Sequence, residues 1–502
     1  MNEPASPVPL AARIAEYGAR RAIVDPGGTW TYDEIDRSAR SLAARLLDGR
    51  DNLADARVAV LCSAGHDFVV GVLACWQAGA VAVPLHPPHP DAELAYVVTD
   101  ADVTAIVVSA AHRPSAARLA AAAGPGVTVV EVDDEGTGPE HGQAGWIPST
   151  MERPALMIHT SGTTGRPKGV VHTHGSVAAQ VDALLSAWKW SADDRILLVL
   201  PLNHVHGIVN VTLCALAAGA CCEAPGGFDA VHVWERLASG DPTLFMAVPT
   251  IYTRLIAAWG QADTSTQAAW SAGAAAARLM VSGSAALPVS TLERWRSITG
   301  QMLLERYGMT ELGMALSNTL ERRVPGHVGV PLPGVDVRVI DDAGRDVGDG
   351  EPGELLVRGP NVFAEYWRRP EATADAFVDG WFRTGDVAVH EPDGYRLLGR
   401  SSVDIIKSGG EKVSALEIEE VFRANRAVDD CAVVGIEDAE WGERVCAAVV
   451  LAPGAAETAE SLRAWGKQRL APSKVPSRYV IVHELPRNTL GKVLKPEVRR
   501  LF

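Results

Sequence analysis

The segment from His159 to Gly169, HTSGTTGRPKG, has the composition of a loop that binds phosphate. Glycine lets a backbone approach a ligand closely and adopt a positive φ, so backbone N–H groups and hydroxyls can turn toward phosphate oxygens. Lys168 adds a positive charge, and the apolar stretch before the loop, Ala155–Ile158, is expected to be a strand. The loop lacks the Gly-Lys-Ser/Thr ending of a Walker A motif. An ordinary surface loop rich in Gly and Thr is the plainer alternative.

Short motifs that combine aromatic residues, glycines and charges occur elsewhere along the chain. They are Trp30-Thr31-Tyr32, Tyr307–Glu311 (YGMTE), Trp381–Asp386 (WFRTGD), Gly399-Arg400 with Asp404–Gly410 (DIIKSGG), and Pro486–Lys492 (PRNTLGK). Together with Thr160–Gly169, these motifs and their order resemble the signature of the adenylate-forming superfamily, which includes acyl-CoA synthetases, adenylation domains of peptide synthetases and luciferases. The resemblance covers nearly the whole chain.

The resemblance implies an enzyme that activates a carboxylate with ATP and then transfers the acyl group to coenzyme A. The carboxylate attacks the α-phosphorus, so cations and oriented dipoles must offset the repulsion between two anions. A magnesium ion, held by hard oxygen ligands, is implied. The resemblance assigns the metal to Glu311 and places Thr310 near the α-phosphate. Taken alone, Thr310 and Glu311 could be a capping pair at the start of a helix.

A nucleotide-binding set follows from the same resemblance. Asp386 is expected to accept hydrogen bonds from the ribose hydroxyls, with Arg400 beside the ribose or the phosphate, while the ring of Tyr307 stacks on adenine. The structural alternatives are a turn-capping Asp386, a surface Arg400 and a core Tyr307. The full set expected to bind ATP and AMP is Thr160, Ser161, Gly162, Thr163, Thr164, Gly165, Lys168, Gly283, Ser284, Ala285, Tyr307, Gly308, Met309, Asp386 and Arg400.

Lys492 lies in a Gly-containing turn near the C-terminus and is expected to be catalytic. A lysine on a mobile domain can enter the site, offset charge between the carboxylate and the α-phosphate, and leave. Relatives rotate the C-terminal domain for thioester formation, which implies a second catalytic lysine, Lys407. The same face would bind CoA through Ser408, Gly409 and Gly410, because glycines leave room for a pantetheine arm. Exposed surface lysines are the alternative for both Lys492 and Lys407.

The acyl group is predicted from fewer residues. The segment Val248–Arg254 (VPTIYTR) resembles its counterpart in malonyl- and methylmalonyl-CoA synthetases, which implies that Arg254 holds the distal carboxylate of a small dicarboxylate. A guanidinium can do so with two parallel hydrogen bonds. A helix-surface Arg254 and a core His206 are the alternatives, and the spacing His204-x-His206 has no evident third metal ligand. The expected substrate-binding set is His206, Arg254, Ser282 and Met309.

Other functions fit parts of the pattern. One is a medium-chain fatty or aromatic acyl-CoA ligase, and another is an enzyme that loads the acyl group onto a separate acyl-carrier protein. A third is an adenylate-binding module without catalysis, which intact Lys492, Glu311 and Asp386 disfavour. No Gly-x-Ser-x-Gly, HExxH or GxGxxG motif in a suitable context supports a hydrolase, a zinc protease or a dinucleotide-binding enzyme.

The elements that must position these motifs alternate between strand and helix. Such alternation predicts an α/β fold in which largely parallel sheets are flanked by helices. After Val324, short strands separated by Gly, Pro and Asp predict a small β-barrel-like subdomain over about 325–400. The expected division is an N-terminal AMP-binding domain, 1–400, and a mobile α+β C-terminal domain, 401–502. Ser401 and Ser402 replace the charged residues that many relatives carry at the hinge, which argues against hinge control by a charged side chain.

Composition narrows the partners. The formal net charge of -15 over 502 residues argues against nucleic-acid binding and against an anionic membrane surface. The expected partners are therefore a small carboxylic acid, ATP and CoA. The seven cysteines form no CxxC pair, which is typical of a reducing compartment. Neither a signal peptide nor a membrane-spanning run is visible, so a cytoplasmic location is expected; the sequence does not indicate an oligomeric state.

Overall fold

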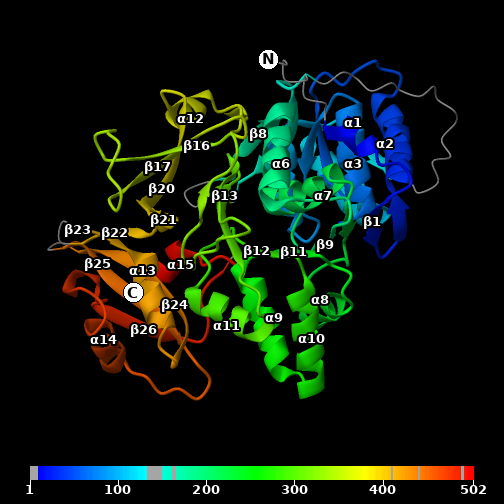
Figure 1. Ribbon diagram of the computed structural model, residues 1–502. Helices are drawn as coiled ribbons and strands as arrows, with labels where there is room; N and C mark the ends of the chain where they lie inside the picture. Colours follow the sequence, from blue (N-terminus) through cyan, green and yellow to red (C-terminus); the bar gives the residue numbers. More distant parts are fainter. Residues whose placement is uncertain (1–9, 133–149, 161–165, 409–410, 439–440, 488–490) are drawn as a thin grey trace, which may run out of the picture.

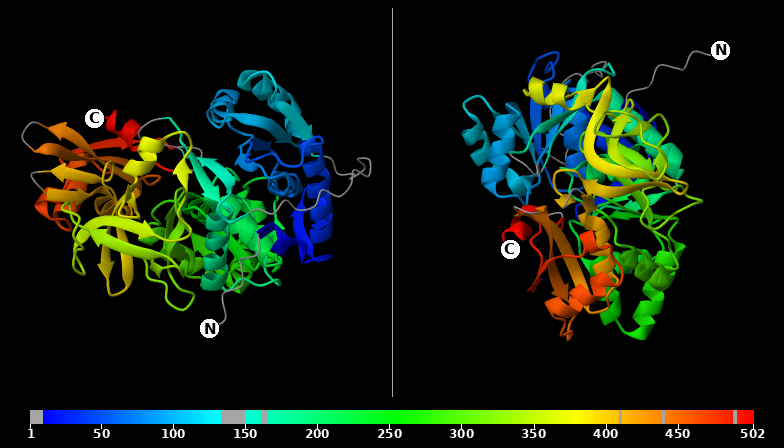
Figure 2. Two further views of the ribbon diagram at one scale, coloured as in Figure 1. Left: turned by 90° about the horizontal axis from the view of Figure 1, so that it is seen from above. Right: turned by 90° about the vertical axis from the view of Figure 1, so that its left-hand side faces the viewer.

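The computed structural model describes residues 10–132, 150–160, 166–408, 411–438, 441–487 and 491–502. Figure 1 shows a larger N-terminal part, coloured blue to yellow, and a smaller C-terminal part, coloured orange to red. The views in Figure 2 agree that the C-terminal part lies beside the green and yellow segments of the larger part. Within the described residues the chain forms four sheets, of which the two largest belong to the N-terminal part.

The first large sheet has seven strands, and its central strands are parallel neighbours. In sheet order the strands are β18 (Glu365–Tyr366), β8 (Gly169–Thr173), β7 (Pro154–His159), β4 (Val81–Pro84), β3 (Arg57–Leu61), β5 (Val103–Val108) and β6 (Thr128–Glu131).

The second large sheet has nine strands and is parallel from β13 to β1, with antiparallel strands at both edges. In sheet order the strands are β15 (Val330–Pro331), β14 (Gly313–Ser317), β13 (Leu304–Met309), β12 (Leu279–Ser282), β11 (Leu244–Ala247), β9 (Arg195–Leu197), β10 (Cys221–Glu223), β1 (Arg21–Asp25) and β2 (Gly28–Thr31).

Helices connect and cover these two sheets. They are α1 (Leu10–Ala15), α2 (Tyr32–Leu47), α3 (His66–Gln77), α4 (Asp91–Asp100), η1 (Ala110–His112), α5 (Arg113–Ala123), α6 (His174–Trp188), η2 (His206–Leu213), α7 (Cys214–Ala217), α8 (Ala230–Ala238), α9 (Pro249–Gln261), α10 (Thr264–Ala276), α11 (Val289–Thr299) and α12 (Pro370–Asp375).

Helix α2 shows how local sequence sets the bounds of an element. Thr31 caps its N-terminus by accepting a hydrogen bond from the Glu34 backbone, and the Glu34 carboxylate accepts one from the Thr31 backbone in return. This reciprocal pair satisfies N–H groups that have no partner inside the helix. Ile35, Ala39 and Leu42 recur at helical spacing and are buried, so one face of α2 packs onto the core.

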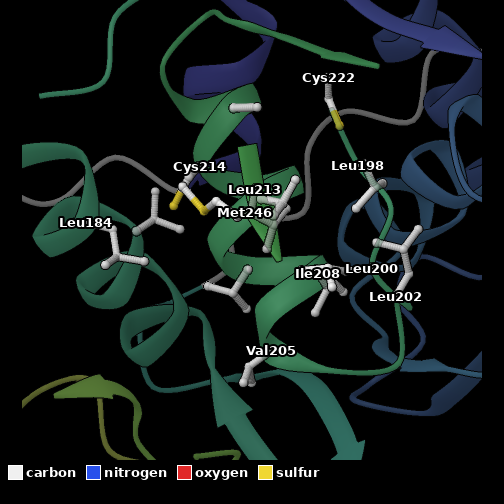
Figure 3. Packing of buried hydrophobic residues seen from close by; sticks show 14 of the residues in the cluster. Leu184, Leu198, Leu200, Leu202, Val205, Ile208, Leu213, Cys214, Cys222 and Met246 are labelled. Atoms are coloured by element: carbon white, nitrogen blue, oxygen red, sulfur yellow. The ribbon is translucent and has the colours of Figure 1, made fainter. Parts of the chain in front are cut away.

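The core continues around η2, a π-helical segment whose residues are all buried. Figure 3 shows Ile208 and Leu213 of η2 packed among Leu184 of α6, Leu198 and Met246. A Cβ atom on Gly207 would lie 2.2 Å from the carbonyl oxygen of Pro201, so only glycine fits at this position. Irregular helical turns of this kind are frequent at functional sites.

The third sheet is antiparallel and has five strands: β16 (Asp336–Ile340), β17 (Pro352–Arg358), β20 (Trp381–Glu391), β19 (Phe377–Val378) and β21 (Gly394–Arg400), the last paired with β20. This sheet forms the small β-rich subdomain expected over about 325–400; β16 and β19 do not pair with each other, so the sheet is open. The short strands and tight turns of the segment suit a small sheet without forcing it to close.

The C-terminal part has its own five-stranded sheet, built from β22 (Ile405–Ser408), β23 (Glu411–Ser414), β24 (Val428–Asp438), β25 (Gly442–Leu451) and β26 (Arg478–Val482). Its helices are α13 (Ala415–Arg423), α14 (Ala459–Lys467), η3 (Pro472–Lys474) and α15 (Lys495–Arg499). Two separate clusters of buried apolar residues cover the faces of this sheet. A core of its own makes this part a separate domain, and the α/β fold class with a smaller C-terminal domain is confirmed.

None of the helices in the described residues has the length and apolar character needed to cross a bilayer. All seven cysteines are buried and reduced.

Candidate active site

Several of the predicted site residues lie where strands of the two large sheets end. β12 and β13 are parallel neighbours, so the segments that follow Ser282 and Met309 leave the sheet at the same edge. The carboxyl ends of parallel strands are the usual place for ligands in open α/β sheets. The phosphate loop follows β7 of the other sheet, and β18 brings Tyr366 next to β8, the strand after that loop.

The phosphate loop is anchored at both ends. The Thr160 backbone N–H donates to the Lys168 carbonyl at 3.0 Å, and the Lys168 N–H donates to Thr160 Oγ1 at 3.3 Å. From α4, the Tyr96 hydroxyl donates to the Pro167 carbonyl at 2.7 Å. Lys168 Nζ lies 4.7 Å from the centre of the Tyr366 ring, a cation–π contact that keeps the charge near the loop. The predicted residues Ser161, Gly162, Thr163, Thr164 and Gly165 lie outside the described residues.

Glu311 is buried at the turn between β13 and β14. Its Oε1 accepts a hydrogen bond from the Tyr366 hydroxyl at 2.8 Å. Burial raises the pKa of this carboxyl, while the Tyr366 hydrogen bond and the charges of Arg400 and Lys168 oppose the rise. The backbone of the preceding Thr310 is fixed as well, because its carbonyl accepts a hydrogen bond from His172 Nε2 at 2.7 Å. The turn therefore presents one fixed carboxylate and not the start of a helix.

His172 and Tyr366 were not predicted as site residues. Burial lowers the pKa of His172 to about 4, so its ring stays neutral and donates from Nε2. A histidine at the end of the strand after the phosphate loop was the only signal in the sequence that could have pointed to it.

Asp386, Tyr307 and Arg400 form one hydrogen-bonded group. The Tyr307 hydroxyl donates to Asp386 Oδ2 at 2.5 Å, and Arg400 Nε donates to Asp386 Oδ1 at 3.2 Å. Asp386 and Arg400 are paired in the ladder between β20 and β21, which explains the fixed geometry. Burial raises the pKa of Asp386, and Arg400 and Tyr307 oppose that rise. Tyr307 thus orients the carboxylate expected to bind ribose.

Lys492 reaches this group from the C-terminal domain. Burial and the charge of Arg400 lower its pKa, while Asp404 and Asp386 raise it, so the ammonium lies within electrostatic reach of the predicted ribose site. The preceding Gly491 has a φ of +76°, and a Cβ atom there would lie 2.6 Å from Thr250 Oγ1. The lysine turn therefore packs closely against the start of α9.

A second cluster surrounds Arg306, a residue that the sequence interpretation missed. Arg306 lies in β13, is only 3% exposed, and forms no ion pair within the described parts of the chain. Its Nε has no hydrogen-bond partner there, and its Nη2 donates to Ser284 Oγ at 3.4 Å. Burial alone lowers the pKa of Arg306 to about 9, so the guanidinium remains charged at neutral pH. A charged residue in an otherwise buried strand was the available signal.

Arg306 is surrounded by other polar groups that lack partners. His206 Nδ1 lies 3.2 Å from Ser284 Oγ, whereas His206 Nε2 and Ser282 Oγ have no partner among the described residues. The guanidinium packs against the backbone of Gly283, where a Cβ atom would lie 2.5 Å from it. Ser284 has a φ of +70° and is exposed, so the cluster opens at this residue. Unsatisfied buried donors at a strained turn indicate a binding site for a polar ligand.

Arg254 does not belong to this cluster. Its side chain is exposed on α9, between the buried Tyr252 and Leu255. The expectation that Arg254 is the buried carboxylate clamp is therefore corrected: the helix turns this residue to water, where an ion pair is worth little.

The remaining predicted residues occupy varied places. Met309 ends β13, and its Sδ lies 3.9 Å from the Tyr307 hydroxyl. Gly308 lies against the Gly313 backbone, and Ala285 is exposed after Ser284. Lys407 is exposed on β22, where its backbone N–H donates to Glu443, and Ser408 is buried. Gly409 and Gly410 lie outside the described residues.

Comparisons with known proteins agree with this arrangement. The family model described as AMP-binding enzyme matches residues 10–367, and that of the AMP-binding enzyme C-terminal domain matches residues 417–492. The chain is 45% identical to the mitochondrial malonate–CoA ligase ACSF3 of Mus musculus, over 98% of this chain and 90% of the relative. The chain therefore belongs to the AMP-binding enzyme family, the class that the fold and the site define.

Solved structures give the same result. The ATP-bound crystal structure of MatB from Rhodopseudomonas palustris superposes with a TM-score of 0.88, at 34% identity and 98% coverage of both chains. The apo structure of the same protein gives a TM-score of 0.79 at the same identity and coverage.

Proposed function

We propose that the chain is an AMP-forming malonate–CoA ligase. It converts malonate, ATP and CoA into malonyl-CoA, AMP and pyrophosphate. The names of several curated relatives agree with this substrate, and methylmalonate is the second candidate substrate. The observation that carries the proposal is the buried, unpaired guanidinium of Arg306 beside His206 and Ser284.

Arg306 explains why the acid should carry a second carboxylate. An unpaired charge in a buried site is costly, and a ligand carboxylate relieves that cost by forming charge-assisted hydrogen bonds. The long aliphatic tail of a fatty acid would leave the guanidinium without a partner. The small distance between the two carboxylates of malonate then brings the reacting carboxylate close to the nucleotide site.

In the first step, a carboxylate oxygen of malonate attacks the α-phosphorus of ATP, and the bond to the pyrophosphate oxygen breaks. Lys492 and Lys168 offset the negative charge of the two reactants, and Asp386 accepts hydrogen bonds from the ribose hydroxyls. Arg400 and Tyr307 hold Asp386 in place for this role.

Magnesium fits the residues that are present. Within the described ranges no group of three or more His, Cys, Asp or Glu side chains could hold a metal ion. Magnesium usually binds through one or two carboxylates together with phosphate oxygens and water, which a single fixed Glu311 satisfies. Glu311 would hold the ion, which supplies positive charge at the phosphates.

In the second step, the CoA thiol attacks the acyl carbonyl of malonyl-adenylate, AMP leaves, and the thiol proton is lost. We place the domain boundary at residues 400–404 and assign Lys407 and Ser408 to the face that the C-terminal domain turns toward the site. A separate acyl-carrier protein is the alternative acceptor. The cytoplasmic location remains a prediction, since the names of several animal relatives place those proteins in mitochondria.

The test is acid-dependent exchange between pyrophosphate and ATP, without CoA, across malonate, methylmalonate, acetate, octanoate and ferulate. Malonate is expected to give the highest kcat/KM. Arg306→Ala should lower the malonate value about a hundredfold or more, since removing one partner of a buried charge pair costs about 3 kcal/mol.

Arg254→Ala is the matched control, because it removes an exposed guanidinium that lies outside the Arg306 cluster, and it should leave the exchange unchanged. A higher kcat/KM for octanoate or ferulate than for malonate would identify the fatty or aromatic ligase instead. Wild-type malonate activity in Arg306→Ala would refute the proposal that Arg306 binds the second carboxylate of malonate.

A further inference from the structure

Helix α11 receives its N-terminal cap from the C-terminal domain. The residue before the helix, Pro288, offers no capping side chain. Instead, the Val289 backbone N–H donates to Glu420 Oε1 of α13 at 3.0 Å, across 131 residues of chain. The first N–H groups of a helix have no partner inside it and lie at the positive end of its dipole, so a carboxylate is favoured there. Figure 1 shows α11 next to the C-terminal domain.

Helix α11 directly follows the segment that contributes to the cluster around Arg306. The short segment between β12 and α11 contains Gly283 and Ser284, which contact Arg306 and His206. Glu420 also lies near β13, the strand that carries Arg306. Burial raises the pKa of Glu305 in that strand to about 8, and the charge of Glu420 contributes to this rise.

Other polar contacts of α13 lie closer to the hinge. Ser414 Oγ donates to the Leu398 carbonyl at 2.6 Å, and Arg396 Nη1 lies 3.1 Å from Glu417 Oε1. Leu398 and Arg396 belong to β21, which ends at Arg400, where we place the hinge. These contacts therefore join the C-terminal domain to the strand that leads into the hinge. The contact of Glu420 instead reaches α11, the helix between β12 and β13 of the nine-stranded sheet, so it helps to hold the orientation of the domain.

We propose that Glu420 is a positioning residue, which holds the C-terminal domain in the orientation that brings Lys492 to Asp386, and that its contact with α11 breaks before thioester formation. The inference rests on the proposed two-step function. It agrees with the higher similarity of the chain to the ATP-bound form of MatB than to the apo form.

The experiment separates the two steps in Glu420→Ala, Glu420→Gln and wild-type protein. Pyrophosphate–ATP exchange with malonate measures adenylation, and conversion of supplied malonyl-adenylate with CoA measures thioester formation. Glu420→Ala should slow adenylation about tenfold, the scale of a lost hydrogen bond to a charged group, and leave thioester formation equal or faster. Glu420→Gln keeps a hydrogen-bond acceptor for the Val289 N–H and should lose less adenylation activity than Glu420→Ala.

Glu460→Ala is the matched control, since Glu460 is exposed in the first turn of α14 in the same domain, and it should match wild type in both steps. Unchanged adenylation in Glu420→Ala, or equal slowing of both steps, would overturn the inference. If wild-type protein makes no malonyl-CoA, the proposed function fails. If it does and the Glu420 variants show no asymmetry, only the inference fails.

Discussion

At the scale of single residues, the site is defined by charges that the fold buries on opposite sides of one strand. Glu305 and Arg306 are neighbours in β13, so their side chains point to opposite faces of the sheet. Arg306 donates to Ser284 but has no ion-pair partner among the described residues, whereas Glu305 accepts one hydrogen bond from the Gly326 N–H at 3.1 Å. Of these two side chains, only the guanidinium of Arg306 therefore faces the proposed substrate site.

Glu305→Gln is expected to stabilise the protein more at pH 8 than at pH 5. Burial raises the pKa of Glu305 from 4.5 to about 8, so the folded state holds its proton more tightly than the unfolded state. Wild-type stability contributed by this group is present below pH 4.5 and is lost as the pH rises toward 8, by on the order of 1 kcal/mol per pH unit.

Gln keeps the acceptor for Gly326 and carries no titrating proton. Thermal unfolding of wild type, Glu305→Gln and the exposed control Glu460→Gln between pH 5 and pH 8 measures the difference. A constant gap between Glu305→Gln and wild type across that range would contradict the raised pKa.

At the scale of elements, η2 positions His206 because it is irregular. The segment is π-helical, its side chains are buried on all sides, and Gly207 lies directly against the Pro201 backbone. His206 at its start is thereby turned toward Ser284, with which it shares a hydrogen bond at 3.2 Å. A regular α-helix would place these residues at different angles.

Gly207→Ala is expected to lower the unfolding temperature by several degrees and to weaken malonate adenylation, because the new methyl group meets backbone and not a movable side chain. Gly260→Ala is the control: Gly260 lies in α9 with nothing within 4 Å of the added Cβ, so this variant should be neutral or slightly more stable. Equal behaviour of the two variants in thermal unfolding would show that the backbone of η2 can move aside.

At the scale of the whole molecule, the active site is shared between two domains with separate cores. Asp386, Arg400 and Glu311 belong to the N-terminal part, whereas Lys492 arrives from the C-terminal domain and is held there by the packing of Gly491 on Thr250. In this orientation Lys492 lies near Asp386, as the proposed adenylation step requires.

Lys492→Ala should lower the rate of malonate adenylation at least about a hundredfold. The substitution removes the ammonium group that offsets the repulsion between the carboxylate and the α-phosphate. Conversion of supplied malonyl-adenylate with CoA should continue at a rate close to that of wild type. The comparison uses the same two assays as for Glu420. If Lys492→Ala slowed adenylation and thioester formation equally, the lysine would act in both steps and not in adenylation alone.

Much of the fold could be predicted from local pattern. The strand expected over Ala155–Ile158 lies within β7 (Pro154–His159), because a run of apolar residues is a signal that acts over a few neighbouring residues. The short strands expected near residues 325–400 are present, but whether they form an open sheet or close on themselves depends on pairing between strands that are distant in sequence.

The sequence by itself was enough to predict the residues proposed to act at the nucleotide: the phosphate loop, Glu311, Asp386 and Lys492 are contained in short motifs whose residues are adjacent along the chain. Only the tertiary structure decided which arginine is buried, since Arg254 and Arg306 differ in burial and not in type. Burial arises from packing among η2 (His206–Leu213), β12 (Leu279–Ser282) and β13 (Leu304–Met309), which are separate along the chain, and no local pattern encodes it. The same reason applies to Glu420, whose partner at Val289 lies in the other domain.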